Sequence, residues 1–157
     1  MQMSVVNVED TITRLVGLYG NGGIWPTATQ WRNLLQSDDT GKILVIHFFK
    51  FRESAVYPDD PSCTISGEGA AFGRYAEAAR APIQQLGVQK IIGMGGKAQA
   101  VIGNDDDWDY VCVMEYPNRM AFLSVFLDEE YSKSHRHRNA GALRHRTTIS
   151  SVIDLPV

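Results

Sequence analysis

The sequence predicts an α+β fold in which four strands and two helices follow the order β-α-β-β-α-β, preceded by two short helices. Three observations support this prediction. Apolar residues recur at helical spacing near the N-terminus, residues 42–51 are apolar on both alternating sets, and further β-rich segments are separated by helical stripes or turns. The 157 residues suffice for one domain that buries about two-thirds of its unfolded surface.

Residues 1–41 are expected to form an N-terminal helical extension. Apolar residues recur at spacings of four, three and four from Val8 to Tyr19, which is typical of one helix face, and a glycine-rich turn follows. Pro26 suits the first turn of a second short helix that ends near Ser37.

The main domain, residues 42–157, begins with a strand over 42–51, KILVIHFFKF. Because both alternating sets are apolar, both faces of this strand must be covered. Residues 52–68 are rich in Pro, Asp and Ser and are expected to be a long loop. A helical stripe then covers 69–86, and Pro82 is expected to kink or shorten its last turn.

Two more strands follow this helix and are joined by an acidic turn. Residues 88–102 carry three glycines, at which a bulge is expected, and residues 108–116 alternate clearly between two faces. Asn118 suits the N-cap of the next helix. The basic stretch 131–146 is expected to be partly helical, and the last strand to cover 147–155.

This element order is that of the ferredoxin-like split βαβ fold with an antiparallel sheet. Its two helices cover only one face of the sheet, although the first strand is apolar on both. Either the N-terminal extension covers the second face, or a second copy of the chain packs sheet against sheet. We favour the second copy and predict a homodimer in which the N-terminal helices lie on the outside.

The composition is that of an ordinary globular protein, with 44% apolar and 21% charged residues. The net charge of −3 argues against a nucleic-acid partner, because such binders are basic overall. No segment has the length of a membrane span, and the N-terminus lacks a signal-peptide pattern. Two cysteines make no disulfide framework, so we expect a cytoplasmic protein without a membrane partner.

Four phrases within these elements resemble the family named domain of unknown function 1330. They are HFFKFRESAVYPDD at 47–60, SGEGAAFGRYAEAARAPI at 66–83, WDYVCVMEYPNRMAFLSVF at 108–126 and HRNAGALRHRTTI at 137–149. The family belongs to the dimeric α/β-barrel superfamily, whose ferredoxin-like subunits pair face to face. The resemblance therefore implies a dimeric α/β barrel.

Short stretches of these phrases resemble positions that recur in the family. They are the segment 47–52, the pair Ser66-Gly67, Tyr75 and the pair His137-Arg138. His47 departs from the family pattern, in which Asn is usual at that position. Superfamily relatives include cofactor-free monooxygenases, lactone isomerases, haem-binding peroxidase-like enzymes and plain binding proteins, so the resemblance implies a fold and a dimer rather than one reaction.

Two histidines are candidates for proton transfer. His47 lies inside the apolar first strand, and His137 stands beside Arg138. A neutral imidazole could take a proton from a ligand while a guanidinium holds the developing negative charge. The alternatives are a hydrogen-bonded core or interface histidine for His47 and a solvated basic face for His137.

Lys50, Arg52 and Arg138 are candidates for binding a carboxylate or an enolate, since their cations suit such groups and arginine can bind them with two parallel hydrogen bonds. Tyr75 could supply a phenolic hydrogen bond. Solvated edge charges and half-buried packing are the respective alternatives.

The stretch 131–146, YSKSHRHRNAGALRHR, holds three of the four histidines, but no known metal-ligand spacing. We therefore predict no metal site and no cofactor. The remaining basic residues of this stretch are expected to face solvent for the most part: His135, Arg136, Arg144, His145 and Arg146.

The function expected from these residues is that of a small-molecule-handling protein. Its ligand would be small and apolar or aromatic, could carry a negative charge, and would bind in the cleft between sheet and helices. Proton transfer or cofactor-free oxidation is one possible chemistry. A non-catalytic binding or dimerisation module and a haem-binding protein are the alternatives.

Overall fold

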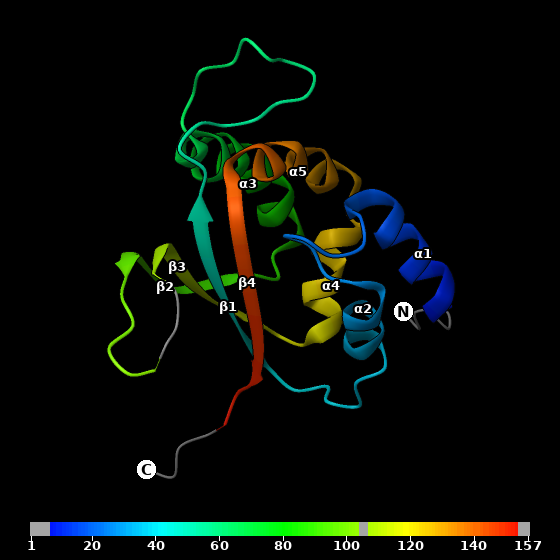
Figure 1. The fold of residues 1–157 in the computed structure, drawn as a ribbon. Coiled ribbons are helices and arrows are strands. Elements are labelled where there is room, and N and C mark those ends of the chain that lie inside the picture. The colour runs from blue at the N-terminus through cyan, green and yellow to red at the C-terminus, as the bar shows by residue number, and fades with distance from the viewer. Residues whose placement is uncertain (1–6, 104–106, 154–157) are drawn as a thin grey trace.

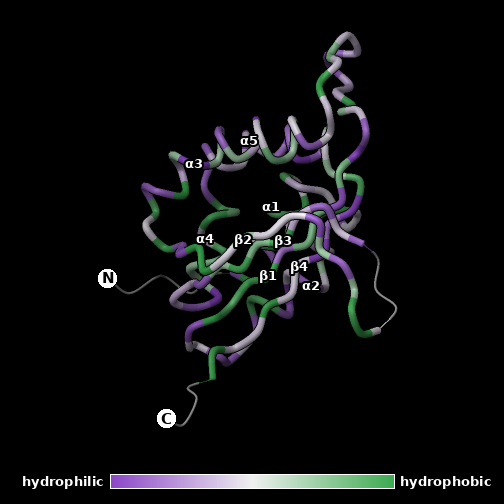
Figure 2. The backbone as a smooth tube through the Cα atoms, turned by 90° about the vertical axis from the view of Figure 1, so that its left-hand side faces the viewer, coloured by the Kyte–Doolittle hydropathy of each residue, from purple (hydrophilic) through white to green (hydrophobic). Residues whose placement is uncertain are grey.

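A computed structural model describes residues 7–103 and 107–153 (Figure 1). The strands form one antiparallel sheet, and the helices gather on one side of it; in Figure 2, α3 and α5 run together beside the strands. In chain order the elements are α1 Val8–Tyr19, α2 Ala28–Leu35, β1 Ile43–Phe51, the π-helix η1 Gly69–Arg74, α3 Tyr75–Leu86, β2 Lys90–Ala98, β3 Trp108–Tyr116, α4 Arg119–Leu127, α5 Glu129–Gly141 and β4 Ala142–Ser151.

The strands lie in the order β2-β3-β1-β4, so β1 pairs with β3 on one side and β4 on the other. This arrangement confirms the predicted α+β, ferredoxin-like fold with its N-terminal helices. The expected bulge also occurs, between Ile91 and Gly93. The register of β1 places His47 opposite Cys112 and Thr147, all on the face that the helices cover.

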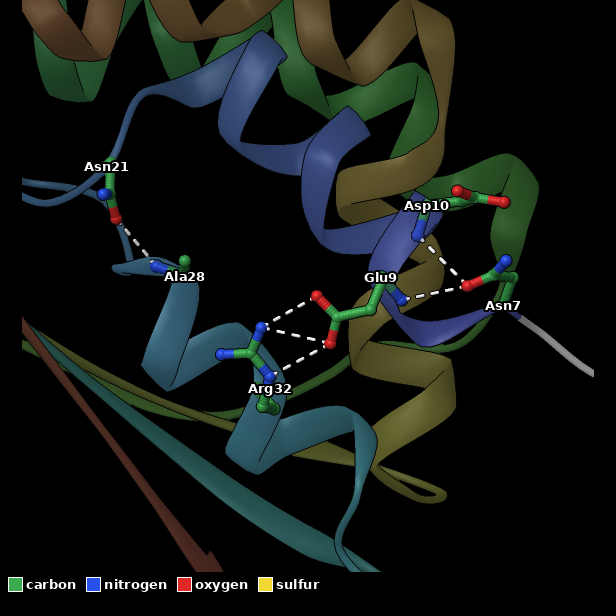
Figure 3. A network of polar contacts seen from close by, with 6 residues as sticks. All are labelled: Asn7, Glu9, Asp10, Asn21, Ala28 and Arg32. Atoms are coloured by element: carbon green, nitrogen blue, oxygen red, sulfur yellow. Dashed lines mark hydrogen bonds and ion pairs between the residues drawn. The ribbon is translucent and has the colours of Figure 1, made fainter.

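The two N-terminal helices are capped and tied to each other by polar contacts (Figure 3). The side-chain oxygen of Asn7 accepts hydrogen bonds from the backbone N–H groups of Glu9 and Asp10, which caps α1. An ion pair of 2.9 Å between Glu9 and Arg32 joins α1 to α2.

The apolar sides of α1 and α2 extend the core that lies on the inner face of the sheet. Its buried residues from the extension and the loop between these helices pack with those of β1 and α4; they include Ile12, Leu15, Tyr19, Trp25, Trp31, Ile43, Phe122 and Phe126. The described part of the extension therefore belongs to the helical layer and does not cover the second face of the sheet.

That second face remains open in the single chain. Along β1 the odd-numbered residues from Ile43 to Phe49 are buried, and the even-numbered residues are half-buried. The apolar residues that β1 and β3 place on this open face are Leu44, Ile46, Phe48, Val111 and Val113.

The expectation that Pro82 would shorten its helix is wrong, because α3 continues to Leu86 with Pro82 inside it, and the expected kink stays a prediction. A proline there removes one backbone hydrogen bond, but Pro82 and Ala79 are both buried. Packing of this helix face against its neighbours offsets the lost bond.

The last strand begins earlier than predicted, at Ala142 rather than Thr147, and is described to Ser151. Its pairing with β1 runs from Phe51 opposite Ala142 to Ile43 opposite Ser151. Cross-strand hydrogen bonds therefore draw the basic residues before Thr147 into the sheet. The predicted residues 154–155 lie outside the described ranges.

A close backbone approach joins the end of β1 to the start of β4. The backbone N–H of Arg52 donates to the carbonyl of Gly141 at 2.8 Å, and the Arg52 carbonyl accepts from the N–H of Gly67 at 3.1 Å. A Cβ atom added to Gly67 would lie 2.1 Å from the Arg52 carbonyl oxygen, and one on Gly141 would lie 2.2 Å from that of Gly67. Only glycine fits at either position.

We expect Gly67→Ala to lower the free energy of unfolding by at least about 1–3 kcal/mol, because backbone atoms must move to admit the new Cβ. Urea unfolding would measure the loss. Gly73→Ala is the matched control, since a Cβ there meets nothing within 4 Å and stability should stay unchanged or rise. Equal stability of Gly67→Ala and the wild type would contradict this close approach.

Candidate functional site

A cavity of ≈ 710 Å³ lies between the inner face of the sheet and helices α3, α4 and α5. This volume falls within the range of small-molecule sites, which is roughly 300–1,000 Å³. Apolar and aromatic side chains dominate the lining, among them Phe49, Phe72, Ile83, Tyr110, Met114 and Phe126.

Arg138 brings a positive charge into this apolar cavity from the last turn of α5. The residue is only 3% exposed. Within residues 7–103 and 107–153 no carboxylate forms an ion pair with it, and its buried Nε has no hydrogen-bond partner. Holding a buried charge without a counter-ion is costly in free energy.

Aromatic rings offset part of this cost. The guanidinium carbon of Arg138 lies 4.0 Å from the ring centroid of Trp25, 5.3 Å from that of Phe49 and 5.8 Å from that of Tyr75. One of its terminal nitrogens donates to the carbonyl of Ile24 at 3.4 Å. These cation–π and dipolar contacts stabilise the cation but do not neutralise it.

Two histidines continue from Arg138 as a chain of hydrogen bonds. Nδ1 of His145 contacts both the Arg138 guanidinium, which can only donate, and the carbonyl of Ile24 at 3.2 Å, which can only accept. Nε2 of His145 lies 3.1 Å from Nδ1 of His47 and 3.0 Å from the hydroxyl of Thr147. Nδ1 of His47 also lies 3.1 Å from that hydroxyl, so the tautomer of each ring sets the direction of these bonds.

Burial keeps both imidazoles neutral. It lowers the pKa of His47 to about 3, and the positive charge of Arg138 adds to the shift. The pKa of His145 lies well below its usual value for the same two reasons, with His47 as a further contribution. His47 is thus a neutral hydrogen-bond donor at physiological pH.

Tyrosine hydroxyls supply further polar groups beside Arg138. The hydroxyl oxygens of Tyr75 and Tyr131 lie 2.6 Å apart. Burial, and secondarily the neighbouring Tyr75, raises the pKa of Tyr131 well above its usual value, so its phenol stays protonated. One hydroxyl of this pair can donate to the other, while the remaining proton is available to a ligand.

The cavity brings together three of the six residues that the sequence singles out: His47, Tyr75 and Arg138. Lys50 does not line it. Lys50 pairs instead with Asp107 at 2.9 Å and Asp109 at 3.0 Å, and these hydrogen bonds raise the pKa of the lysine.

Arg52 and His137 also lie outside this cavity. Arg52 follows the end of β1 and lines a separate, shallower hollow. His137 projects from α5 toward the long loop, where its Nδ1 lies 2.8 Å from the hydroxyl of Tyr57. Partial burial lowers its pKa, followed by the charges of Arg136 and Arg74. The ligand roles of Lys50, Arg52 and His137 remain predictions.

The expectation that His145 and His135 face solvent is wrong. His145 is half-buried, and its ring stacks on Phe49 with centroids 4.1 Å apart. It turns inward because β4 already includes it, opposite Phe49. His135 lies on the inner side of α5, with its ring 5.6 Å from that of Tyr19.

Sequence reasoning missed His145 because the last strand was placed five residues too late. His145 and Thr147 lie on one alternating face of β4, but a register shift places the buried Ala142, and not the exposed Leu143, opposite Phe51. The irregularity interrupts the alternating pattern just before His145, and arginines flank this histidine on both sides.

No family model and no curated protein matches the chain. It is similar to the crystal structure of a protein of unknown function from Rhodopseudomonas palustris, at 26% identity and a TM-score of 0.75, over 86% of this chain and 100% of that one. A methylated form of the same protein gives a TM-score of 0.75 at 26% identity, over 85% and 97%.

A third solved structure, of a dimeric protein of unknown function with a ferredoxin-like fold from Bacteroides fragilis, shows 14% identity and a TM-score of 0.49, over 71% of this chain and 97% of that one. A likeness this low carries no argument for this chain. The Rhodopseudomonas likeness extends across most of the fold but names no ligand or reaction, so the site must be interpreted from its own chemistry.

Within the described ranges, buried side-chain nitrogens without a hydrogen-bond partner also occur at Trp31, Arg52 and Arg119. Ser132 and Ser134 donate to carbonyls within α5, whereas His47 and Arg138, the other two buried polar residues, line the cavity. Among residues 7–103 and 107–153, no three His, Cys, Asp or Glu side chains come close enough to hold a metal ion. No helix in those ranges is long and apolar enough to cross a membrane.

The two buried histidines predict how stability depends on pH. Below pH 6.5, the ordinary pKa of histidine, His47 and His145 are protonated in the unfolded chain but stay neutral in the folded protein. The free energy of unfolding should therefore fall as pH drops from 7 to 5, approaching about 1.4 kcal/mol per pH unit for each histidine.

Urea unfolding at several pH values would measure this slope in the wild type and in His47→Gln. The variant removes one of the two groups and should show a shallower slope, while His137→Gln, which changes a more exposed imidazole, should reduce it less. If His47→Gln kept the full wild-type slope, His47 could not be the buried neutral group described above.

Proposed function

We propose that the protein binds a small, apolar or aromatic anion in the cavity, with the negative group placed against Arg138. The observation that carries this proposal is the burial of the Arg138 guanidinium, 3% exposed, without a carboxylate partner in the described ranges. A ligand carboxylate, enolate or phenolate would supply the missing counter-charge and a partner for Nε.

The lining favours an aromatic or branched apolar body behind that anionic group. Phe49, Phe72 and Tyr110 present rings to the cavity, and Met114 supplies an adaptable thioether. In the tautomer that carries its proton on Nε2, His47 would be a second donor for the ligand. Two donors that converge on one end of an apolar cavity orient a ligand as well as bind it.

The same residues would support a reaction in which the ligand is neutral when it binds and becomes an anion in the site. An activated carbonyl compound that loses a proton would gain negative charge where Arg138 and His47 can stabilise it. His47→Gln separates an enzyme from a binding module, because an enzyme would lose turnover with a modest change in affinity, while a binding module has no turnover to lose.

The anion preference can be tested with benzoate and its neutral analogue benzamide as probes, by isothermal titration calorimetry. Benzoate should bind about 10- to 100-fold more tightly than benzamide, which is the range expected for hydrogen bonds to a charged group. Arg138→Gln should remove that preference, and Arg138→Lys should retain part of it, because lysine keeps the charge without the guanidinium fork.

Arg136→Gln is the matched control, since Arg136 lies on the same helix but is exposed and pairs with Asp59 at 2.7 Å. Its benzoate affinity should equal that of the wild type. Equal affinity for the acid and the amide in the wild type would contradict the proposal. A Soret band in the purified protein would indicate that the cavity serves haem instead.

We also propose that the protein is a homodimer joined through the open face of the sheet. The supporting observation is the apolar strip that Leu44, Ile46 and Phe48 form with Val111 and Val113, half-buried in the single chain. Water contact at such a strip in the centre of a sheet is unfavourable, and a second sheet would remove it.

We expect light scattering after size exclusion to show twice the chain mass of 17.5 kDa for the wild type and the single-chain mass for Phe48→Glu. The glutamate would remove the apolar ring and bring a charge into the interface, and its desolvation is costly even beside Arg146. Val56→Glu changes an exposed apolar residue of the long loop and should leave the dimer intact. A monomeric wild type would contradict the proposed dimer.

A further inference from the structure

A second hollow, of ≈ 630 Å³, opens where β1 ends and β4 begins. None of the residues that line it also lines the cavity of Arg138. Its wall includes Ile24, Arg52, Trp108, Asn139, Arg144 and His145. Two guanidinium groups are thus present in a lining that contains no carboxylate.

The backbone of Arg52 is fixed more firmly than a surface arginine requires. Both its N–H and its carbonyl are hydrogen-bonded, to Gly141 and Gly67, at the junction where neither glycine can accept a Cβ. This junction sets the point from which the side chain leaves the end of β1. The backbone of Arg52 is therefore fixed at the edge of this hollow.

The side chain of Arg52 has no partner in the part of the chain that the structure describes. No carboxylate, carbonyl or ring of residues 7–103 and 107–153 contacts its guanidinium through a hydrogen bond, ion pair or cation–π contact. Its Nε is shielded from solvent and unpaired, although the residue as a whole is half-buried. A shielded donor without an acceptor is unfavourable, and an oxyanion would satisfy it.

A second donor and an aromatic wall stand in the same hollow. The side-chain oxygen of Asn139 accepts from the indole N–H of Trp25 at 2.6 Å, so its amide group is oriented and its two N–H bonds remain as donors. The guanidinium carbon of Arg144 lies 5.0 Å from the ring centroid of Trp108, which holds a further positive charge at the rim.

We infer that this hollow is a second binding site, for a small oxyanion such as a carboxylate or a phosphate. Arg52 binds the anion, and the Asn139 amide is the neighbouring donor. The site is separate from that of Arg138 and does not depend on the proposed function of the first cavity.

Inorganic phosphate and acetate are suitable probes, titrated separately against the purified protein and followed by ¹H–¹⁵N spectra that include the arginine Nε–H signals. Arg52→Gln should weaken binding of the preferred probe at least tenfold, and Arg52→Lys should weaken it less, because it keeps the charge but loses the fork. Tighter binding of phosphate than of acetate would identify a phosphate group as the natural ligand chemistry, and the reverse order a carboxylate.

Two controls separate this site from its surroundings. Arg136→Gln, at an exposed position outside both cavities, should bind the probes as the wild type does. Benzoate binding in the first cavity should be unchanged in Arg52→Gln, so failure of one site is distinguishable from failure of the other.

Wild-type affinity of Arg52→Gln for both probes would overturn the inference, since Arg52 would then be only a solvated charge. Loss of probe binding in Arg138→Gln but not in Arg52→Gln would also overturn the inference. A change of oligomeric state in Arg52→Gln without a change in probe affinity would also overturn it, because Arg52 would then contact a second copy of the chain.

Discussion

The central strand β1 imposes the main constraint on this protein, because it is apolar on both faces and hydrogen-bonded along both edges. Its inner residues, from Ile43 to Phe49, form the floor of the helical core. Its outer residues form an apolar strip that the described chain leaves half-buried, with the guanidinium of Arg146 over the Phe48 ring. The helical layer, the cavity and the proposed dimer are all consequences of how each face of this one strand is buried.

The inner face combines apolar burial with a charge that apolar burial disfavours. Arg138 is stabilised by Trp25, by a carbonyl and by the imidazole of His145, all of which tolerate a cation without neutralising it. Such an arrangement lowers the cost of holding the guanidinium ready while leaving it attractive to an anion. The low pKa of His145 and His47 follows from the same burial, so both imidazoles stay neutral beside the positive charge of Arg138.

The order of elements could be predicted because hydrophobic periodicity is a local property of the chain. The first helix, β3 and the Asn118 cap all lie where the pattern indicated. The start of β4 could not be predicted, because its inward positions include a histidine and a threonine rather than a continuous apolar set. Cross-strand hydrogen bonds with β1 determine that boundary and override the local preference of the basic residues for a loop.

By itself the sequence determined the fold class, the double-sided first strand and the presence of His47, Tyr75 and Arg138 as residues suited to a ligand. Only the tertiary structure decided which of these meet. His47 and His145 are 98 positions apart in the chain, and they touch because the β1–β4 register places Phe49 opposite His145. A shift of one residue would turn every side chain of β4 to the other face. Alternation along β1 itself separates Lys50 from the cavity, since neighbouring residues of a strand point to opposite sides of the sheet.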